Sequence, residues 1–399
     1  MSKQTTVGEL IAAFLEQCGV RTAFGVISIH NMPILDAIGT RGKIRYVGAR
    51  GEAGAVNMAD GLARVSGGLG VAFTSTGTAA GNAAGAMVEA LTAGTALLHI
   101  TGQIETEYLD QDLAYIHEAP DQLSMLQSIS KAAFRVRSVE TALPTIREAV
   151  RVAQTAPSGP VSVEIPIDIQ AALTDWPEDL TAPHITTLTH DDARVEKLAQ
   201  ELAKAKRPLL WLGGGARQAG KAIERLVALG FGVVTSVQGR GVLPEDHPAT
   251  LGAFNVHPAV ESFYKTCDAM LVVGSRLRGN ETLKYKLALP QPLYRIDADA
   301  LADNRGYRND LFVHGDAAAV LDALATRLEG KLKVDASFAG DLAAARETAV
   351  ADTAKGLGPY RTLVETLQRS VGRNYNWVRD VTISNSTWGN RLLKIFSPR

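Results

Sequence analysis

The stretch YVGARGEAGAVNMADGLARVSG, residues 46–67, places a carboxylate where a predicted strand gives way to a predicted helix. The apolar run Ile44–Val47 predicts a strand that ends in a turn of small residues. The Ala-, Met- and Leu-rich segment after the turn predicts a buried helix, and Glu52 stands at its start. The positive end of the helix macrodipole stabilises a carboxylate at that position. The position is also where open α/β sheets bind ligands.

The same alternation of strand and helix continues on both sides of this stretch. The spacing of apolar residues predicts an amphipathic helix at 6–18 and a short helix at 32–38. The predicted strands of this part of the chain are 22–26, 44–47, 69–75, 96–102 and 160–166. Strands that alternate with helices form a parallel sheet covered on both faces. We therefore predict one doubly wound α/β domain over residues 1–175.

A second alternation follows a polar segment, residues 172–190, which is rich in turn-forming residues and is interpreted as a linker. The apolar runs beyond it predict strands within 207–216, 232–237, 269–275, 292–299 and 310–324. The helical segments between these runs again predict a parallel sheet. We expect a Rossmann-like central domain over residues 190–332.

The last part of the chain, residues 355–399, contains a predicted helix at 360–371 and a predicted strand at 377–385. One helix and one strand cannot bury a core of their own. We therefore expect the opening of a third α/β domain without its remainder. The predicted fold class is α/β, with two doubly wound parallel-sheet domains and the start of a third.

Composition excludes several classes of protein. The formal net charge is -1, so no overall basic field attracts nucleic acid or an anionic membrane. No apolar run reaches the roughly 20 residues of a membrane span, and the first residues lack the apolar core of a secretory signal. Cys18 and Cys267 lie far apart, without the spacing of a disulfide framework or a zinc site. We expect a cytoplasmic protein with no nucleic-acid or membrane partner.

Three loops follow predicted strands at their carboxyl ends: Glu52, TGTAAGN at 76–82, and TGQ at 101–103. In open α/β sheets that edge binds ligands. Taken singly, Glu52 is explained by the helix N-terminus, and 76–82 by a tight turn. The loop is not a phosphate-binding P-loop, since no GK[ST] follows, and the glycines at 213–215 match GxGxxG poorly.

Several motifs together are more specific than any one of them, and they resemble the pyrimidine-binding domain of thiamine-diphosphate enzymes, the acetolactate synthase group in particular. The motifs are FGV…HN.P..DA (24–37), GARGEAGAVNMADGLARVSG (48–67), FTSTGTAAGN (73–82), LLHITGQ (97–103) and GPVSVEIPIDIQ (159–170). Residues 205–325 resemble the central domain of the same enzymes. Two positions depart from the usual family pattern: Gly51 replaces a common histidine, and Thr78 replaces a proline.

The resemblance implies a catalytic role for Glu52. In the family this glutamate hydrogen-bonds N1′ of the cofactor's aminopyrimidine and shares a proton with it. The 4′-nitrogen can then remove the C2 proton of the thiazolium, which is acid–base catalysis relayed through the cofactor. The resemblance assigns the pyrimidine cradle to Thr76, Gly77, Thr78 and Asn82.

The resemblance also implies an activity: decarboxylation of a 2-oxo acid such as pyruvate, with carboligation to a second carbonyl compound as in acetolactate synthases. A benzoylformate-type 2-oxo acid decarboxylase is the alternative within the family. The substrate-side candidates are His30, Gln103 and His117. A solvated loop histidine without a role is the competing explanation for His30 and His117.

The resemblance implies Mg²⁺ as well, which the family holds by an aspartate and a downstream asparagine of its C-terminal domain, whose oxygens suit this ion. No GDG motif followed by such an asparagine occurs in the chain, so we expect no metal ligands here and an inactive, truncated chain. FAD is possible in the central domain, where Arg276 and Arg278 suit a pyrophosphate. The family's site forms between subunits, which implies a homodimer or homotetramer.

Two other classes of function compete with this hypothesis. The first is a non-catalytic truncated relative that binds a nucleotide or a full-length partner. The absence of the metal motif favours it, whereas the retention of Glu52 beside Asn82 and the small-residue loop speaks against it. The second is an NAD-binding dehydrogenase, which the poor GxGxxG match disfavours.

Overall fold

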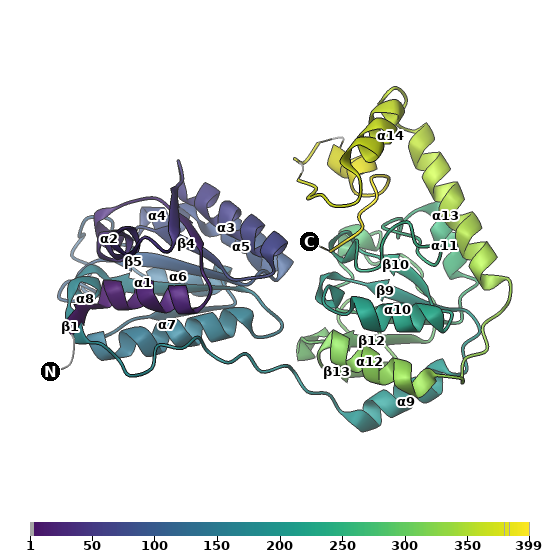
Figure 1. The fold of residues 1–399 in the computed structure, drawn as a ribbon, viewed down its shortest axis with the longest axis horizontal. Helices are drawn as coiled ribbons and strands as arrows, with labels where there is room; N and C mark the ends of the chain where they lie inside the picture. Colours follow the sequence, from purple (N-terminus) through teal and green to yellow (C-terminus); the bar gives the residue numbers. More distant parts are fainter. Residues whose placement is uncertain (1–3, 379, 383, 399) are drawn as a thin grey trace. The chain divides into compact units, whose positions relative to one another are not determined.

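The computed structural model of the chain describes residues 4–378, 380–382 and 384–398. Contacts between residues divide the chain into two compact units, Met1–Thr186 and Thr187–Arg399, here called unit 1 and unit 2. Each unit is built on a parallel sheet with helices on both faces (Figure 1). The predicted α/β class with two doubly wound sheets is therefore confirmed.

The sheet of unit 1 has six strands in the order β3-β2-β4-β5-β7-β6, and every neighbouring pair is parallel. In chain order the strands are β2 (Thr22–Gly25), β3 (Arg45–Gly48), β4 (Gly70–Thr74), β5 (Leu97–Gln103), β6 (Ala132–Arg135) and β7 (Pro160–Pro166). The central strands β4, β5 and β7 are buried along their whole length, as in other sheets covered on both faces. Because all six strands run in one direction, the loops that follow them lie at one edge.

Helices cover both faces of this sheet because successive strand residues point to opposite sides. On β4, Val71 and Phe73 pack with α1 (Val7–Gln17), α2 (Met32–Arg41) and α7 (Val139–Gln154). Ala72 of the same strand packs with α3 (Glu52–Ser66), α5 (Ala84–Ala93) and α6 (Gln122–Ile129). Shorter elements complete the unit, namely α4 (Thr78–Asn82), α8 (Ile167–Ala171) and the antiparallel pair β1 (Gln4–Thr6) and β8 (Leu173–Asp175).

Unit 2 repeats this plan with five parallel strands in the order β10-β9-β11-β12-β13. The strands are β9 (Pro208–Leu212), β10 (Gly232–Thr235), β11 (Ala269–Val273), β12 (Leu293–Asp297) and β13 (Leu311–His314). One face packs against α9 (Asp192–Leu202), α10 (Gly220–Ala228) and α12 (Ala317–Leu328). The other face packs against α11 (Pro258–Tyr264) and α13 (Phe338–Lys355), with Trp211 fully buried between them and the sheet.

The C-terminal part differs from its prediction. The helix expected at 360–371 is present as α14 (Tyr360–Val371), but the strand expected at 377–385 is wrong for the described residues of that range. Positions 379 and 383 lie outside the description. A strand needs a neighbouring strand to pair its backbone groups; here Trp377 packs on Trp388 at 5.3 Å between ring centroids, within a small apolar cluster. A third domain over 355–399 stays a prediction.

A fully buried histidine on β5 makes the stability of unit 1 depend on pH. His99 lies between Thr74 Oγ1 (2.9 Å) and Ser162 Oγ (3.0 Å), and burial lowers its pKa from 6.5 to about 4. Between these pH values the unfolded chain binds a proton that the folded chain does not, so stability falls with decreasing pH. We expect a loss of roughly 3 kcal/mol across this window.

The measurement is urea unfolding at several pH values for the wild type and for His99→Gln, which has no titrating ring. The wild type should lose stability as the pH falls from 6.5 to 4, and the variant should lose less. An identical dependence on pH in both proteins would contradict this assignment of the buried group.

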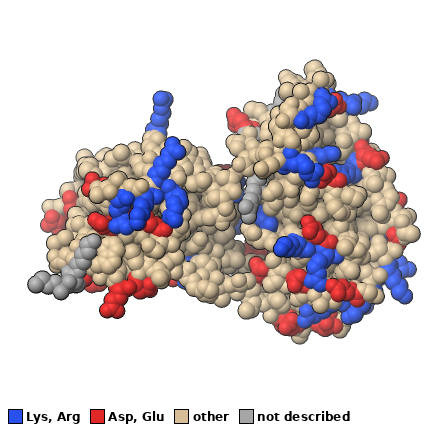
Figure 2. Space-filling view, in the orientation of Figure 1, with Lys and Arg blue, Asp and Glu red and all other residues tan. Residues whose placement is uncertain are grey.

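The surface charge, the lengths of the apolar helices and the two cysteines bear on the classes of protein that composition excludes. Figure 2 shows Lys and Arg interspersed with Asp and Glu on the visible face of the molecule. Within the described residues, no helix has both the length and the apolar character that a membrane crossing requires. Cys18 and Cys267 are both free thiols, and burial raises the pKa of each to about 12.

Candidate functional site

The three loops singled out in the sequence lie at one edge of the unit 1 sheet. Glu52 begins α3 after β3, residues 76–82 follow β4, and Gln103 is the last residue of β5. In the sheet order these strands are β3, then β2, then β4 and β5, and all four are parallel. Their carboxyl ends therefore lie at the same edge. The sequence argument for a common site therefore has the topology it needs.

Glu52 and Asn82 contact each other directly. The Asn82 side chain donates from Nδ2 to Glu52 Oε2 at 3.2 Å. Gly51 is the N-cap of α3 and supplies no side-chain capping bond, so the Glu52 carboxylate stands at a helix N-terminus whose dipole favours negative charge. Glu52 is half-buried and Asn82 is exposed, so the pair remains accessible from the sheet edge.

Gly77 gives the loop after β4 its shape. Its φ of +57° lies in the left-handed region, which glycine adopts without the strain of a side chain. A Cβ at this position would also collide with the backbone carbonyl of His117, which passes directly over it. The residue N-caps α4, whose first residue, Thr78, is exposed. The small-residue turn is therefore needed for close backbone contact as well as for its conformation.

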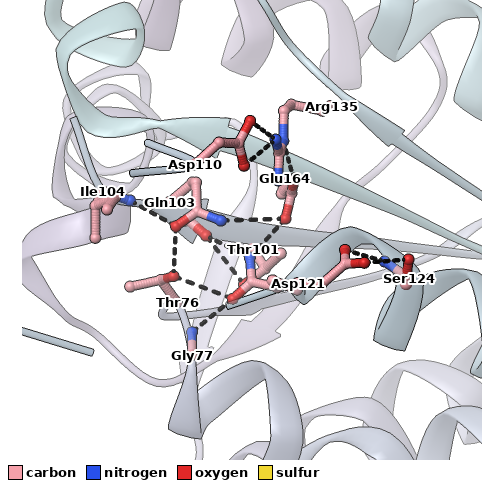
Figure 3. A network of polar contacts seen from close by, with 12 residues as sticks. Thr76, Gly77, Thr101, Gln103, Ile104, Asp110, Asp121, Ser124, Arg135 and Glu164 are labelled. Carbon is pink, nitrogen blue, oxygen red and sulfur yellow. Dashed lines mark hydrogen bonds and ion pairs between the residues drawn. The ribbon is translucent and has the colours of Figure 1, made fainter. Parts of the chain in front are cut away.

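Thr76 and Gly77 are held by two buried glutamines (Figure 3). Gln122 Oε1, on α6, accepts from Gly77 N at 2.5 Å, and it lies 3.0 Å from Thr76 Oγ1. Gln103 Oε1 lies 3.0 Å from the same hydroxyl and accepts from Ile104 N at 2.8 Å. Thr76, Gln103 and Gln122 are each no more than 2% exposed. In this structure the Gln103 amide is engaged in the network, and its substrate-side role stays a prediction.

A buried ion pair lies behind the glutamines, and the sequence argument missed it. Glu164 of β7 is fully buried and accepts from Gln122 Nε2 at 2.8 Å and from Gln103 Nε2 at 3.3 Å. Its other oxygen pairs with Arg135 of β6, which also contacts Asp110 at 2.8 Å (Figure 3). The signal was present: a lone glutamate within the apolar strand PVSVEIP is costly unless it is paired.

The two candidate histidines of unit 1 lie near each other. The His30 and His117 rings meet edge to face at 6.1 Å between centroids, and His30 Nδ1 is 3.4 Å from Ser75 Oγ. His30 is only 2% exposed, and its burial lowers its pKa, opposed by the nearby Glu105 charge. His117 is exposed and has a φ of +63°, which is uncommon for a residue with a side chain. Both rings therefore lie close to the loop after β4.

At the corresponding edge of unit 2, the glycine turn after β9 contacts Gly274 in the loop after β11. A Cβ on Gly213 or on Gly215 would collide with the backbone of Gly274, which follows β11. Gly215 N donates to Gly274 O at 3.0 Å. The glycine turn at 213–215 is thus required by the contact between two loops of the protein itself.

Positive charge gathers beside those loops. Arg276 has a lowered pKa, first because it is partly buried and then because Arg278 and Arg305 lie near it. Asp297, at the end of β12, is mostly buried, and burial raises the pKa of its carboxyl group. Arg305 is paired with Asp299 at 2.8 Å, so this edge carries charges of both signs.

Two sequence profiles of one family match the chain. The N-terminal TPP-binding domain of thiamine pyrophosphate enzymes matches residues 5–125, and the central domain of thiamine pyrophosphate enzymes matches residues 195–324. The first match contains Glu52, the loop after β4, and both histidines. The second contains all five strands of the unit 2 sheet.

Individual proteins extend these matches. A probable 2-ketoarginine decarboxylase of Pseudomonas aeruginosa is 34% identical over 86% of the chain and 62% of its own length. The large subunits of acetolactate synthase isozymes 2 and 3 of Escherichia coli are 32% and 29% identical over 77% and 79% of the chain, and 56% of each relative is covered. The chain thus spans between 56% and 62% of the length of these relatives. It belongs to the thiamine pyrophosphate enzyme family, of which it carries the N-terminal cofactor-binding domain and the central domain.

Proposed function

We propose that this chain is part of a thiamine-diphosphate-dependent enzyme that decarboxylates a 2-oxo acid and joins the product to a second carbonyl compound, as an acetolactate synthase does. The observation that carries the proposal is the contact between Glu52 and Asn82, at the sheet edge within the matched N-terminal domain. A packing role alone does not require a carboxylate and an amide to face each other at an accessible helix N-terminus.

The donor set at this edge fits an aminopyrimidine. The Glu52 carboxyl group can accept a hydrogen bond from a ring nitrogen that carries a proton, or donate to one that does not. Asn82 offers both an amide donor and an amide oxygen, and its bond to Oε2 holds the carboxyl group in place. The space at Gly77 is filled by the His117 carbonyl, so the accessible part of this loop is at Thr78 and Asn82, which are both exposed.

Bound thiamine diphosphate would supply a carbon nucleophile for the keto group and would accept the electron pair left by CO₂. The residues of this chain would then manage protons and orientation. Glu52 would hold a proton at its carboxyl group and exchange it with the pyrimidine ring. His30, whose pKa is lowered by burial, can accept or donate a proton at a ring nitrogen near the substrate, and His117 lies beside it.

Simple decarboxylation is the second candidate, and the 34% identity to a probable 2-ketoarginine decarboxylase favours it.

A product assay separates the two functions. The enzyme that contains this chain would be incubated with pyruvate or with 2-ketoarginine, thiamine diphosphate and Mg²⁺. Acetolactate from pyruvate supports carboligation, an aldehyde from 2-ketoarginine supports decarboxylation, and release of CO₂ from neither compound contradicts the choice of these 2-oxo acids.

Replacing Asn82 by alanine should weaken cofactor binding more than it slows the chemical step. The change removes the hydrogen bond that orients the Glu52 carboxyl group, and we expect roughly a tenfold increase in the dissociation constant of thiamine diphosphate. Calorimetric titration of the wild type and of Asn82→Ala measures this dissociation constant. The control variant is Asn57→Ala, on the exposed part of α3. Equal affinities for all three proteins would remove Asn82 from the site.

Mg²⁺ and FAD remain parts of the proposal. Among the described residues there is no group of three or more His, Cys, Asp or Glu side chains that could hold a metal ion. We propose that Mg²⁺ binds with the cofactor diphosphate through other ligands. Arg276 and Arg278, just after the glycine contact at Gly274, support FAD or another anionic nucleotide in unit 2. A flavin absorbance band in the purified protein would support FAD.

We also propose a homo-oligomer, either a dimer or a tetramer. Large apolar side chains close in sequence to the candidate histidines are more than half exposed, namely Ile27, Ile29, Leu113 and Ile116. Apolar surface of this kind is typical of a contact with another subunit. Light scattering of the purified protein would measure the assembly.

A further inference from the structure

The buried Glu164 lies one layer behind the loop that carries Thr76 and Gly77. It touches neither residue directly, and the two glutamines lie between. Each glutamine turns its amide nitrogen to Glu164 Oε2 and its amide oxygen toward the loop, as Figure 3 shows for Gln103. Backbone groups contribute to this polarity, since Gln122 Nε2 also donates to Gly102 O at 3.2 Å and Gln103 Oε1 accepts from Ile104 N at 2.8 Å. Glu164 is the common cause that acts on both amide nitrogens.

That cause follows from what each terminal group can do. An ionised carboxylate only accepts hydrogen bonds, and a backbone N–H only donates. An amide between Glu164 and Gly77 N can satisfy both groups in just one orientation, with nitrogen toward the carboxylate and oxygen toward the N–H. Arg135 places the opposite charge beside the buried Glu164 carboxylate, and Asp110 binds the same guanidinium through another nitrogen.

We propose that Glu164 is a positioning residue: through Gln122 and Gln103 it fixes the loop from Thr76 to Asn82 and, with it, the Asn82 partner of Glu52. The link to cofactor binding rests on the proposed function, whereas the link to the loop does not. Gln122 is the main element of this relay, since the loop N–H at Gly77 has its oxygen as acceptor.

Glu164→Gln reverses the polarity with almost no change in shape. The new amide has one oxygen, and this oxygen accepts from the Arg135 guanidinium, because a charged donor forms the stronger hydrogen bond. The new amide nitrogen then faces the nitrogens of Gln103 and Gln122, which are donors too. Both glutamines lose their shared acceptor, and Gln122 Nε2 keeps only its bond to Gly102 O at 3.2 Å. The Gln122 oxygen that accepts from Gly77 N–H is then held less firmly, and this hydrogen bond opens more often.

The test is hydrogen–deuterium exchange of the whole chain without ligand, followed by mass spectrometry of peptides that cover 76–82. In Glu164→Gln the exchange of this segment should speed up roughly tenfold or more. The matched control is Glu16→Gln, since Glu16 is also buried in unit 1 and pairs with both Arg41 Nε (2.7 Å) and Nη2 (2.8 Å). Unchanged exchange at 76–82 in Glu164→Gln, or an equal increase in Glu16→Gln, would overturn the proposal.

A second variant keeps the test decisive if Glu164→Gln fails to fold. Gln122→Met has a similar length and lacks the amide, so Gly77 N–H loses its acceptor and the segment 76–82 should exchange faster. Wild-type exchange there in a folded Gln122→Met protein would also overturn the proposal.

Titration of thiamine diphosphate and Mg²⁺ into the enzyme that contains this chain separates the two claims. Weaker binding in Glu164→Gln than in Glu16→Gln supports the whole relay. Faster exchange at 76–82 with wild-type affinity would overturn its extension to the cofactor. A wild-type protein that binds no cofactor would instead contradict the proposed function, while the exchange data would still decide the role of Glu164.

Discussion

Glu52→Gln is expected to lower the turnover of the enzyme that contains this chain by roughly 10²- to 10⁴-fold, the usual size of a general acid–base contribution. Glutamine keeps the shape and can still contact Asn82, but it cannot exchange a proton with a pyrimidine nitrogen. The folded structure should persist, because glutamine has nearly the same size and the side chain is only half-buried. Steady-state rates with saturating cofactor and circular dichroism measure the two effects.

The matched control is Glu89→Gln, an exposed glutamate on α5 of the same unit. Its turnover should equal that of the wild type, since Glu89 lies outside the loops of the candidate site and takes no part in the proposed proton exchange. Wild-type turnover in Glu52→Gln would contradict the proposed role, whatever the effect on cofactor affinity.

Arg135→Met should produce the largest loss of stability. The change leaves Glu164 fully buried without its opposite charge, and removal of one partner of a buried pair costs about 3–5 kcal/mol. Urea unfolding of unit 1, followed by circular dichroism, gives the difference.

Arg151→Met is the control for this prediction. Arg151 pairs with Glu148 on the exposed face of α7, where both side chains are more than 40% exposed. Solvent screens such a pair, and its loss should change the stability by less than about 1 kcal/mol. Equal effects of the two substitutions would show that Glu164 does not depend on Arg135.

The strands of both sheets could be predicted from the sequence because each is a short apolar run bounded by turn residues. Pro160–Pro166 was predicted with the bounds that the structure has. The strand Ala132–Arg135 was missed, because its alternation of small, aromatic and charged residues is typical of no single element. The strand expected at 377–385 failed because the sequence of a single strand does not reveal whether a partner is available to pair with it.

The candidate site could be predicted only in part. Glu52 and Asn82 are 30 positions apart, and their contact follows from the parallel order of the strands that precede them. Gln122 and Glu164 were not identified, because their role depends on side-chain orientation between segments far apart in the chain. A buried carboxylate in an apolar strand is a usable signal, but it does not name its partner.

The exchange of the C2 hydrogen of bound thiamine diphosphate with deuterium tests the central claim most directly. Magnetic resonance would follow it in the enzyme that contains this chain, as the wild type and as Glu52→Gln. Our account predicts rapid exchange in the wild type and exchange slower by orders of magnitude in the variant. Equal exchange rates in two proteins that both bind the cofactor would show that Glu52 does not drive this proton transfer, and the account would be wrong.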